Sequence, residues 1–267
     1  MTQAFMRERQ WRGTPRLHRL RNQRRDLPHE RKSEVALLYG WHPVTAALAN
    51  PARRVRRLLA TENAVRRLNR EGIALPETFE VVRPDAIAAR LTRDAVHQGL
   101  MAEADPLPSP EIESLQASGI ALVLDQITDP HNVGAILRTA AAFAVSAVVT
   151  TARHSPEASG VLAKSASGAL ELVPIVVVQN LARGLCALKE RGFAVVGLDS
   201  DAPHELAALP LRDPLALVLG AEGKGLRQGT RGACDRLARL DLPGAIKSLN
   251  VSNAAALALY ITHRAVA

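Results

Sequence analysis

The sequence predicts an α/β protein whose larger domain, at residues 119–267, is built on a parallel β-sheet. Three observations support this fold class. From residue 119 onward, short apolar runs alternate with segments of helical periodicity, which is the pattern of strand–helix–strand units. The run at 120–125 is almost continuously apolar, as expected for a strand buried on both faces. A smaller α/β domain at 33–104 precedes it, separated by a proline-rich linker at 105–118.

In the small domain, Pro43 suits the first turn of a helix and Thr61 suits an N-cap position. The expected elements are strands at 34–39, 55–60, 79–83 and 98–104, and helices at 42–49, 62–70 and 84–91. Arginines lie close together in this stretch: Arg53, Arg54, Arg56, Arg57, Arg66, Arg67 and Arg70. By itself, such a run is typical of a solvated face.

In the large domain, strands and helices alternate to the end of the sequence. The expected strands are at 120–125, 147–151, 172–178, 194–199, 215–219 and 239–242, and the helical segments at 132–144, 161–166, 181–191, 225–234 and 251–264. Because the strands are expected to be parallel, a ligand should bind at their carboxyl ends.

The net charge of +8 favours a polyanionic partner, either nucleic acid or an anionic membrane surface. Most of it lies at residues 1–32, which hold ten basic and three acidic residues and therefore carry +7. Few residues there are apolar, so we expect a basic, disordered arm that contacts phosphates.

Other features limit where and how the protein acts. The two cysteines, Cys186 and Cys234, are far apart, so neither a disulfide framework nor a zinc site is indicated, and we expect both to be buried. No apolar run reaches the roughly 18 residues that a membrane helix needs, and no signal peptide is evident. We expect a cytoplasmic protein with no membrane partner and no metal.

The first polar cluster runs from Asp125 to Arg138, between a buried strand and a helix. Asn132 suits the N-cap of that helix, and Gly134 allows a backbone or ligand to approach closely. Helical side chains lean toward the N-terminus, so the long side chain of Arg138 can reach back toward Asn132. For an isolated Asn and Arg, however, a capped helix with a solvated arginine is the more common explanation.

Two further clusters follow strands. Leu219–Leu226 contains three glycines but matches neither a Walker loop, since Gly225 follows Lys224, nor the dinucleotide fingerprint. It is therefore either a ligand-binding loop of another kind or a simple turn. Leu242–Asn253 leads into the last helix and carries more polar side chains than one N-cap requires.

Together, these clusters resemble the three motifs of the SpoU (TrmH) family of RNA 2′-O-ribose methyltransferases, in the SPOUT superfamily. The matching segments are Asp129–Arg138, Leu217–Leu226 and Leu242–Ala256, and the resemblance spans about residues 34–267. It implies a deep trefoil knot, S-adenosylmethionine as the methyl donor, and a homodimer whose active sites are completed across the interface. True knots are rare exceptions among folds, and sequence periodicity could not have indicated one.

Within the small domain, Leu38–Val44 and Val96–Leu100 resemble the substrate-binding domain of the 23S rRNA guanosine 2′-O-methyltransferase branch, which itself resembles a ribosomal-protein fold. This resemblance favours rRNA over tRNA. It makes six arginines candidate RNA contacts: Arg53, Arg54, Arg56, Arg57, Arg66 and Arg67. Two residues depart from the family pattern, since Lys247 replaces a frequently acidic residue and Asn253 a frequent valine.

The resemblance also implies roles for individual residues. The candidate catalytic residues are Asn132, Arg138, Glu222, Ser248 and Asn250. The candidate donor-binding residues are Leu198, Gly220, Gly223, Leu242 and Leu249. The family resemblance makes Arg138 the base, but a guanidinium has a pKa above about 12. We therefore hypothesise that Arg138 stabilises the developing alkoxide and holds the neighbouring phosphate.

Three alternatives stay open. One is a tRNA ribose methyltransferase of the same family. Another is a catalytically silent RNA-binding or ribosome-assembly factor, which would not need to retain Asn132, Arg138 and Glu222. The third, a nucleotide-dependent oxidoreductase, is disfavoured by the missing glycine fingerprint.

Overall fold

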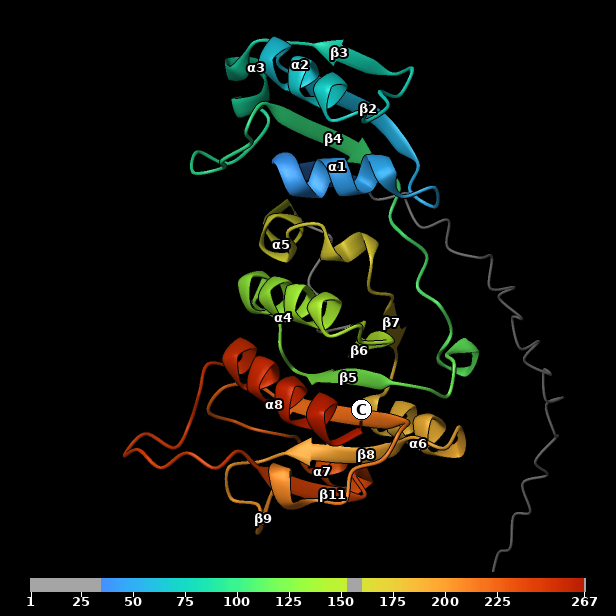
Figure 1. Ribbon diagram of the computed structural model, residues 1–267, viewed down its shortest axis with the longest axis vertical. Helices are drawn as coiled ribbons and strands as arrows, with labels where there is room; N and C mark the ends of the chain where they lie inside the picture. The colour runs from blue at the N-terminus through green and yellow to red at the C-terminus, as the bar shows by residue number, and fades with distance from the viewer. Residues whose placement is uncertain (1–34, 153–159, 267) are drawn as a thin grey trace, which may run out of the picture. The chain divides into compact units, whose positions relative to one another are not determined.

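The computed structural model describes residues 35–152 and 160–266. The predicted arm at 1–32 lies outside the described residues. The described residues form two β-sheets, one of four strands and one of seven, with helices packed against both (Figure 1). The predicted α/β class, with a small sheet domain before a large parallel sheet, is confirmed.

The small sheet has the strand order β1-β4-β2-β3. Its elements are β1 (Ala36–Tyr39), α1 (Trp41–Ala49), β2 (Val55–Ala60), α2 (Glu62–Arg70), β3 (Phe79–Val81), α3 (Pro84–Ala88) and β4 (Leu100–Ala104). Strand β4 pairs antiparallel with both β1 and β2, whereas β3 pairs parallel with β2. Thr61 caps α2 as predicted, because its side chain accepts a hydrogen bond from the backbone N–H of Ala64.

The large sheet has the order β7-β6-β5-β10-β8-β11-β9, and every neighbouring pair is parallel. Its strands are β5 (Ile120–Asp125), β6 (Ala147–Thr151), β7 (Ile175–Val178), β8 (Ala194–Leu198), β9 (His204–Glu205), β10 (Leu215–Gly220) and β11 (Arg236–Arg239). The helices are α4 (Pro130–Ala142), α5 (Gly160–Ala166), α6 (Leu181–Glu190), α7 (Gln228–Ala233) and α8 (Val251–Val266), with 3₁₀ turns η1 (Ile112–Ser114), η2 (Ala169–Glu171) and η3 (Leu206–Ala208).

Helices cover both faces of the large sheet, which explains the continuous apolar runs. In β5, Leu122 and Leu124 pack into one core with α4, α5 and α8. The intervening Ala121 and Val123 pack into a second core with α6 on the opposite face. Because successive side chains of a strand point to opposite faces, a strand covered on both sides must be apolar throughout.

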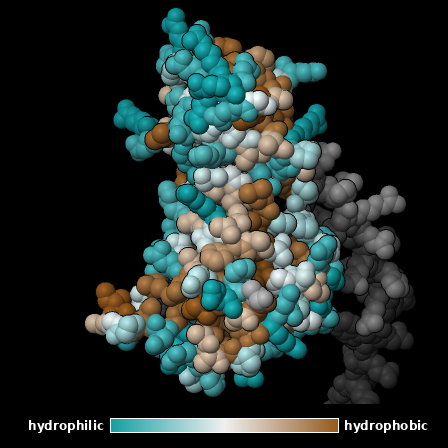
Figure 2. Space-filling model, in the orientation of Figure 1, coloured by the Kyte–Doolittle hydropathy of each residue, from teal (hydrophilic) through white to brown (hydrophobic). Residues whose placement is uncertain are grey.

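Two loops meet at the carboxyl ends of the central strands β8 and β10. One connects β10 to α7 and the other connects β11 to α8, and the second projects from the domain (Figure 1). The tip of this projection is coloured hydrophobic in Figure 2, and its Ile246 is 77% exposed. The knot implied by the family resemblance stays a prediction.

Several local expectations differ from the structure. Helix α4 begins at Pro130, and Asp129 rather than Asn132 caps it, because the proline occupies the first helical turn. The strand expected at 239–242 is β11, which ends at Arg239. Cys186 is exposed rather than buried. None of the helices within the described residues is long and apolar enough to cross a membrane.

An ion pair joins the small domain to the large one. Arg53 donates to both carboxylate oxygens of Glu171 in η2, with the shortest contact at 2.6 Å, and both side chains are almost fully buried. Asn50 donates to the same carboxylate at 2.8 Å, and Arg53 also donates to the carbonyl of Asp105 at 2.7 Å. Contrary to the prediction, Arg53 therefore does not present its guanidinium to RNA; burial with a carboxylate makes it a structural residue.

Removal of one partner from this pair should destabilise the fold strongly. Arg53→Ala leaves the Glu171 carboxylate buried with only Asn50 as a hydrogen-bond donor, so we expect a loss of about 3 kcal/mol in the free energy of unfolding. Urea unfolding followed by circular dichroism measures it. The matched control is Arg54→Ala, whose side chain is 83% exposed and which should change stability by less than about 0.5 kcal/mol. Equal stability of the two variants would contradict the assignment.

Candidate active site

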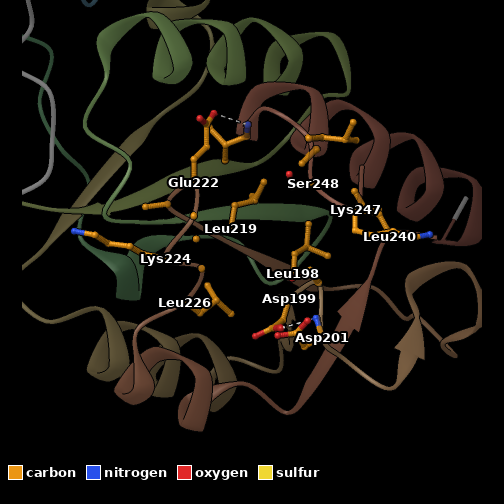
Figure 3. A pocket seen from close by; sticks show the side chains of 18 of the residues that line it. Leu198, Asp199, Asp201, Leu219, Glu222, Lys224, Leu226, Leu240, Lys247 and Ser248 are labelled. Atoms are coloured by element: carbon orange, nitrogen blue, oxygen red, sulfur yellow. Dashed lines mark hydrogen bonds between the residues drawn. The ribbon is translucent and has the colours of Figure 1, made fainter. Parts of the chain in front are cut away.

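A cavity of about 330 Å³ opens at the carboxyl ends of β8 and β10. The β10–α7 loop, the β11–α8 loop and the first turn of α8 form its other walls. All five predicted donor-binding residues line it: Leu198, Gly220, Gly223, Leu242 and Leu249. Figure 3 shows Leu198, Leu219 and Leu226 in the middle of the site, with Glu222 and Ser248 at one end and Asp199 and Asp201 at the other. The site therefore combines an apolar centre with two polar ends.

The glycine-rich loop has a shape that only glycines permit. A Cβ atom on Gly220 would lie 2.2 Å from the backbone carbon of Gly225, far inside van der Waals contact. Gly225 donates its N–H to the carbonyl of Ala221 at 2.8 Å, which closes the loop back on β10. Gly223 and Gly225 both have positive φ angles, of 72° and 63°. The loop thus brings backbone groups to the cavity, together with the side chains of Glu222 and Lys224.

A hydrogen-bonded cluster joins the three sequence motifs. Asn250 Nδ2 donates to Glu222 Oε1 at 2.8 Å and to Asn132 Oδ1 at 3.0 Å. Glu222 Oε1 also accepts the backbone N–H of Val251, the first residue of α8, at 3.1 Å. The carboxylate therefore sits at a helix N-terminus, where the helix dipole favours a negative charge. Asn132, Glu222 and Asn250, predicted separately, lie together in space.

Arg138 is exposed on α4, on the helix that carries Asn132. Among the contacts of the described residues, it makes no hydrogen bond or ion pair, so the structure does not join it to the Glu222–Asn250 cluster. Ser248 lines the cavity but is likewise not hydrogen-bonded to the cluster within the described part of the chain. The guanidinium of Arg138 is thus available to an external anion.

Sequence reasoning missed two carboxylates at strand ends. Asp125, at the end of β5, is fully buried and accepts from the backbone N–H of Arg227 at 2.9 Å and from its Nε at 2.7 Å. Asp199 lines the cavity just after β8 and accepts from Arg231 at 2.5 Å. Their positions at the carboxyl ends of expected strands were the signal that could have identified them.

The described side chains do not favour metal-ion chemistry or a cysteine nucleophile. Within residues 35–152 and 160–266, no three His, Cys, Asp or Glu side chains are grouped to hold a metal ion. Burial raises the pKa of the Cys234 thiol to about 11, so it stays protonated at neutral pH and is a poor nucleophile. Lys247 lines the cavity, with its Nζ donating to the carbonyl of Leu242 at 2.6 Å.

Comparison with family models assigns both parts of the chain. Residues 119–260 match the SpoU rRNA Methylase family. Residues 37–110 match a family of domains described as RNA 2′-O ribose methyltransferase substrate binding. The two matches correspond to the large and the small sheet.

Curated relatives cover nearly the same length. The chain is 38% identical over 239 residues to the 23S rRNA (guanosine-2′-O-)-methyltransferase RlmB of Pseudomonas putida, covering 85% of this chain and 96% of the relative. It is 37% identical over 236 residues to the protein of the same name from Ralstonia nicotianae, covering 85% and 95%.

Solved structures show the same fold. A putative RNA methyltransferase of the TrmH family from Porphyromonas gingivalis superposes with a TM-score of 0.72 at 28% identity, covering 86% of this chain and 90% of that one. AviRb from Streptomyces viridochromogenes, a SpoU methyltransferase solved in complex with AdoMet, superposes with a TM-score of 0.74 at 23% identity, covering 86% and 89%.

A methyl group added to Gly220 should distort the β10–α7 loop and so weaken ligand binding in the cavity. In Gly220→Ala, the new Cβ must displace the backbone of Gly225, so we expect the affinity for S-adenosylhomocysteine, measured by calorimetry, to fall at least about tenfold. Gly229→Ala is the matched control, because a Cβ there meets no atom within 4 Å and its affinity should be unchanged. Unchanged binding in Gly220→Ala would separate the loop from the binding site.

Proposed function

The chain belongs to the SpoU rRNA methylase family, and from this premise we propose that it transfers the methyl group of S-adenosylmethionine to a ribose 2′-hydroxyl of RNA. We further propose that the substrate is a guanosine of 23S rRNA, as in the relatives named above. Such a reaction belongs in the cytoplasm. The observation that carries the proposal is the Glu222–Asn250–Asn132 cluster, which joins the first motif by hydrogen bonds to the two motifs that line the cavity.

The cavity suits the methyl donor in shape and chemistry. Leu198, Leu219 and Leu226 offer an apolar surface for a nucleoside, and the glycine loop offers backbone groups for its polar edges. S-adenosylmethionine supplies an electrophilic methyl group on a sulfonium that is already a good leaving group. The residues of this chain then need to align the acceptor oxygen with that methyl group, at roughly 3–3.5 Å, and to manage its proton.

Arg138 stabilises the negative charge that develops on the acceptor oxygen. A guanidinium stays protonated at neutral pH, so it stabilises the alkoxide and holds the adjacent phosphate instead of removing the proton. The proton leaves late, to phosphate or water. Asn132 orients the ribose from the same helix, while Glu222 and Asn250 fix the loop and the helix start around it. Ser248 positions the substrate phosphate at the cavity.

The small domain binds the RNA in this proposal, and its arginines differ in how freely they can do so. Arg57 pairs with Glu80 at 2.8 Å, and hydrogen bonding to Glu80 chiefly raises the pKa of Arg57. Arg67 pairs with Glu71 at 2.8 Å and stacks over Trp41, whereas Arg56 pairs with Asp105. Arg54 and Arg66, with side chains 83% and 76% exposed, have only long contacts of 4.0 and 3.3 Å to carboxylates. Among the six predicted contacts, they are the most available to a phosphate.

The same proposal includes a homodimer that completes each active site. Large apolar side chains are exposed on the C-terminal elements of the domain: Ile246 and Leu249 in the β11–α8 loop, of which Leu249 lines the cavity, and Tyr260 on α8. Large exposed apolar side chains favour a protein interface where they gather into a patch. A second copy that covers this surface would bring further side chains to the cavity.

The dimer is tested by Tyr260→Asp, which places a charge on the exposed face of α8. We expect the dissociation constant measured by sedimentation equilibrium to rise at least about tenfold, since an unpaired charge is costly in an interface core. Val81→Asp, at a comparably exposed valine of the small sheet, is the control and should leave association unchanged. A wild-type protein that sediments as a monomer would contradict the homodimer.

Methyl transfer is tested with labelled S-adenosylmethionine and separated, unmodified 23S rRNA, 16S rRNA and tRNA. We expect label in 23S rRNA, in one alkali-resistant linkage, and a fall in kcat of about 10²–10³-fold in Arg138→Ala because the alkoxide loses its stabilising charge. Arg138→Lys should rescue only partly, since an ammonium lacks the forked geometry. Arg183→Ala, an exposed arginine of α6, should keep full activity.

Label in tRNA alone would keep the chemistry and overturn the substrate. If RNA binds but no fraction is labelled, including precursor ribosomal particles, the protein is an RNA-binding factor without catalytic activity.

A further inference from the structure

Lys164, on α5, carries a positive charge that no acidic side chain of the described residues pairs with. Resting on the proposed function, we propose that its ammonium group binds a phosphate of the RNA backbone, at the junction between the small domain and the active site. Among the described residues, no carboxylate lies within salt-bridge distance of Lys164, and its hydrogen bond goes to the neutral amide oxygen of Gln98, at 3.0 Å. Most arginines of the small domain, in contrast, are paired.

The surroundings make this unmatched charge unusual. Lys164 is partly buried, and that burial lowers the pKa of its ammonium group. Partial burial of an ammonium group costs some free energy, which an anion from another molecule would offset. An ammonium has three N–H donors, and Gln98 accepts one of them, so donors remain for a phosphate oxygen.

Two residues of the small domain, Gly40 and Gln98, lie against the end of this lysine side chain. A Cβ atom on Gly40 would lie 2.6 Å from Lys164 Nζ, so the glycine leaves room for it. Gln98 has a φ of 51°, in the left-handed region that favours glycine, and its amide oxygen also accepts the backbone N–H of Trp41 at 2.9 Å. Strained backbone of this kind persists where the surrounding structure requires it. The segments 38–44 and 96–100, singled out in the sequence, thus converge on Lys164.

The next residue along α5 contacts the first motif. Ser165 Oγ lies 3.3 Å from His131 Nδ1, and His131 directly precedes Asn132. A Cβ atom on Gly134 would lie 2.3 Å from Ser165 Cβ, so α5 and α4 are in close contact. On its other side, Ala163 is buried in the core of the small domain. An RNA strand that contacts both the small domain and Asn132 therefore crosses α5 beside Lys164.

A different role must be separated from this one. Through Gln98, Lys164 could simply tether the small domain to the large one, without touching RNA. Lys164→Met removes both the positive charge and the hydrogen bond to Gln98 that would act as the tether. Gln98→Asn removes only the tether, because asparagine tolerates positive φ but its amide is one methylene shorter. Lys164→Arg keeps the charge.

The experiment measures the salt dependence of binding to an unmodified 23S rRNA transcript, with S-adenosylhomocysteine present. For Lys164→Met, we expect the slope of log K against log salt to become shallower by about 0.7–0.9 and affinity at 0.1 M salt to fall about fivefold, the signature of one lost phosphate contact. Lys164→Arg and Gln98→Asn should keep the wild-type slope. The affinity for S-adenosylhomocysteine should be the same in all four proteins.

An unchanged slope in Lys164→Met would overturn the inference, and so would an equal loss in Gln98→Asn, which would make Lys164 a tether. Methyl transfer by the wild-type protein is followed in parallel. If the wild type methylates RNA and Lys164→Met keeps its slope, the inference alone fails. If the wild type binds RNA but methylates none, the proposed function fails while the slopes still decide the role of Lys164. A wild type that binds no RNA overturns both.

Discussion

The carboxylate of Glu222 ties together the parts of the chain that form the cavity. One of its oxygens accepts from Asn250 and from the first N–H of α8, and Asn250 reaches Asn132 at the start of α4. Three segments are thereby fixed relative to one another, although Asn250 is 28 residues from Glu222 and 118 residues from Asn132 in the sequence. Two of these hydrogen bonds are charge-assisted, and such bonds are stronger than those between neutral groups. The cluster holds the β10–α7 loop, the start of α8 and the start of α4 in fixed relative positions, and the first two of these form walls of the cavity.

The glycines of the β10–α7 loop make that constraint possible. Gly220 lies so close to Gly225 that the loop turns back onto the end of β10. This turn places the Glu222 carboxylate at the N-terminus of α8. A loop that is already closed by its own hydrogen bond loses little conformational freedom when a ligand binds. The parallel sheet contributes the rest, since the carboxyl ends of β8 and β10 meet at one edge.

Sequence patterns located the strands and the motifs, but not the pairing of individual charges. The apolar run of β5 predicted a strand covered on both faces, as it is, but not its place in the strand order, where it pairs with β6 and β10. Arg53 looked like its neighbours, yet it is buried against Glu171, 118 residues away. Asn132 was expected to cap α4, but Asp129 with Pro130 offered an earlier start. Whether an arginine such as Arg53 is buried depends on a partner far away in the sequence, and a local sequence pattern contains no information about that partner.

The distribution of matched and unmatched charges separates structural from functional cations. Arg53 and Arg227 are each held by a carboxylate that is itself almost fully buried, so their charge is neutralised within the fold. Arg138 and Lys164 have no such partner among the described residues, although each lies on a helix that is packed against a neighbouring helix. An unpaired, partly desolvated cation weakens the isolated fold slightly and becomes favourable only when an anion arrives. A polyanionic substrate with a regular spacing of phosphates is the ligand that matches two such cations at once.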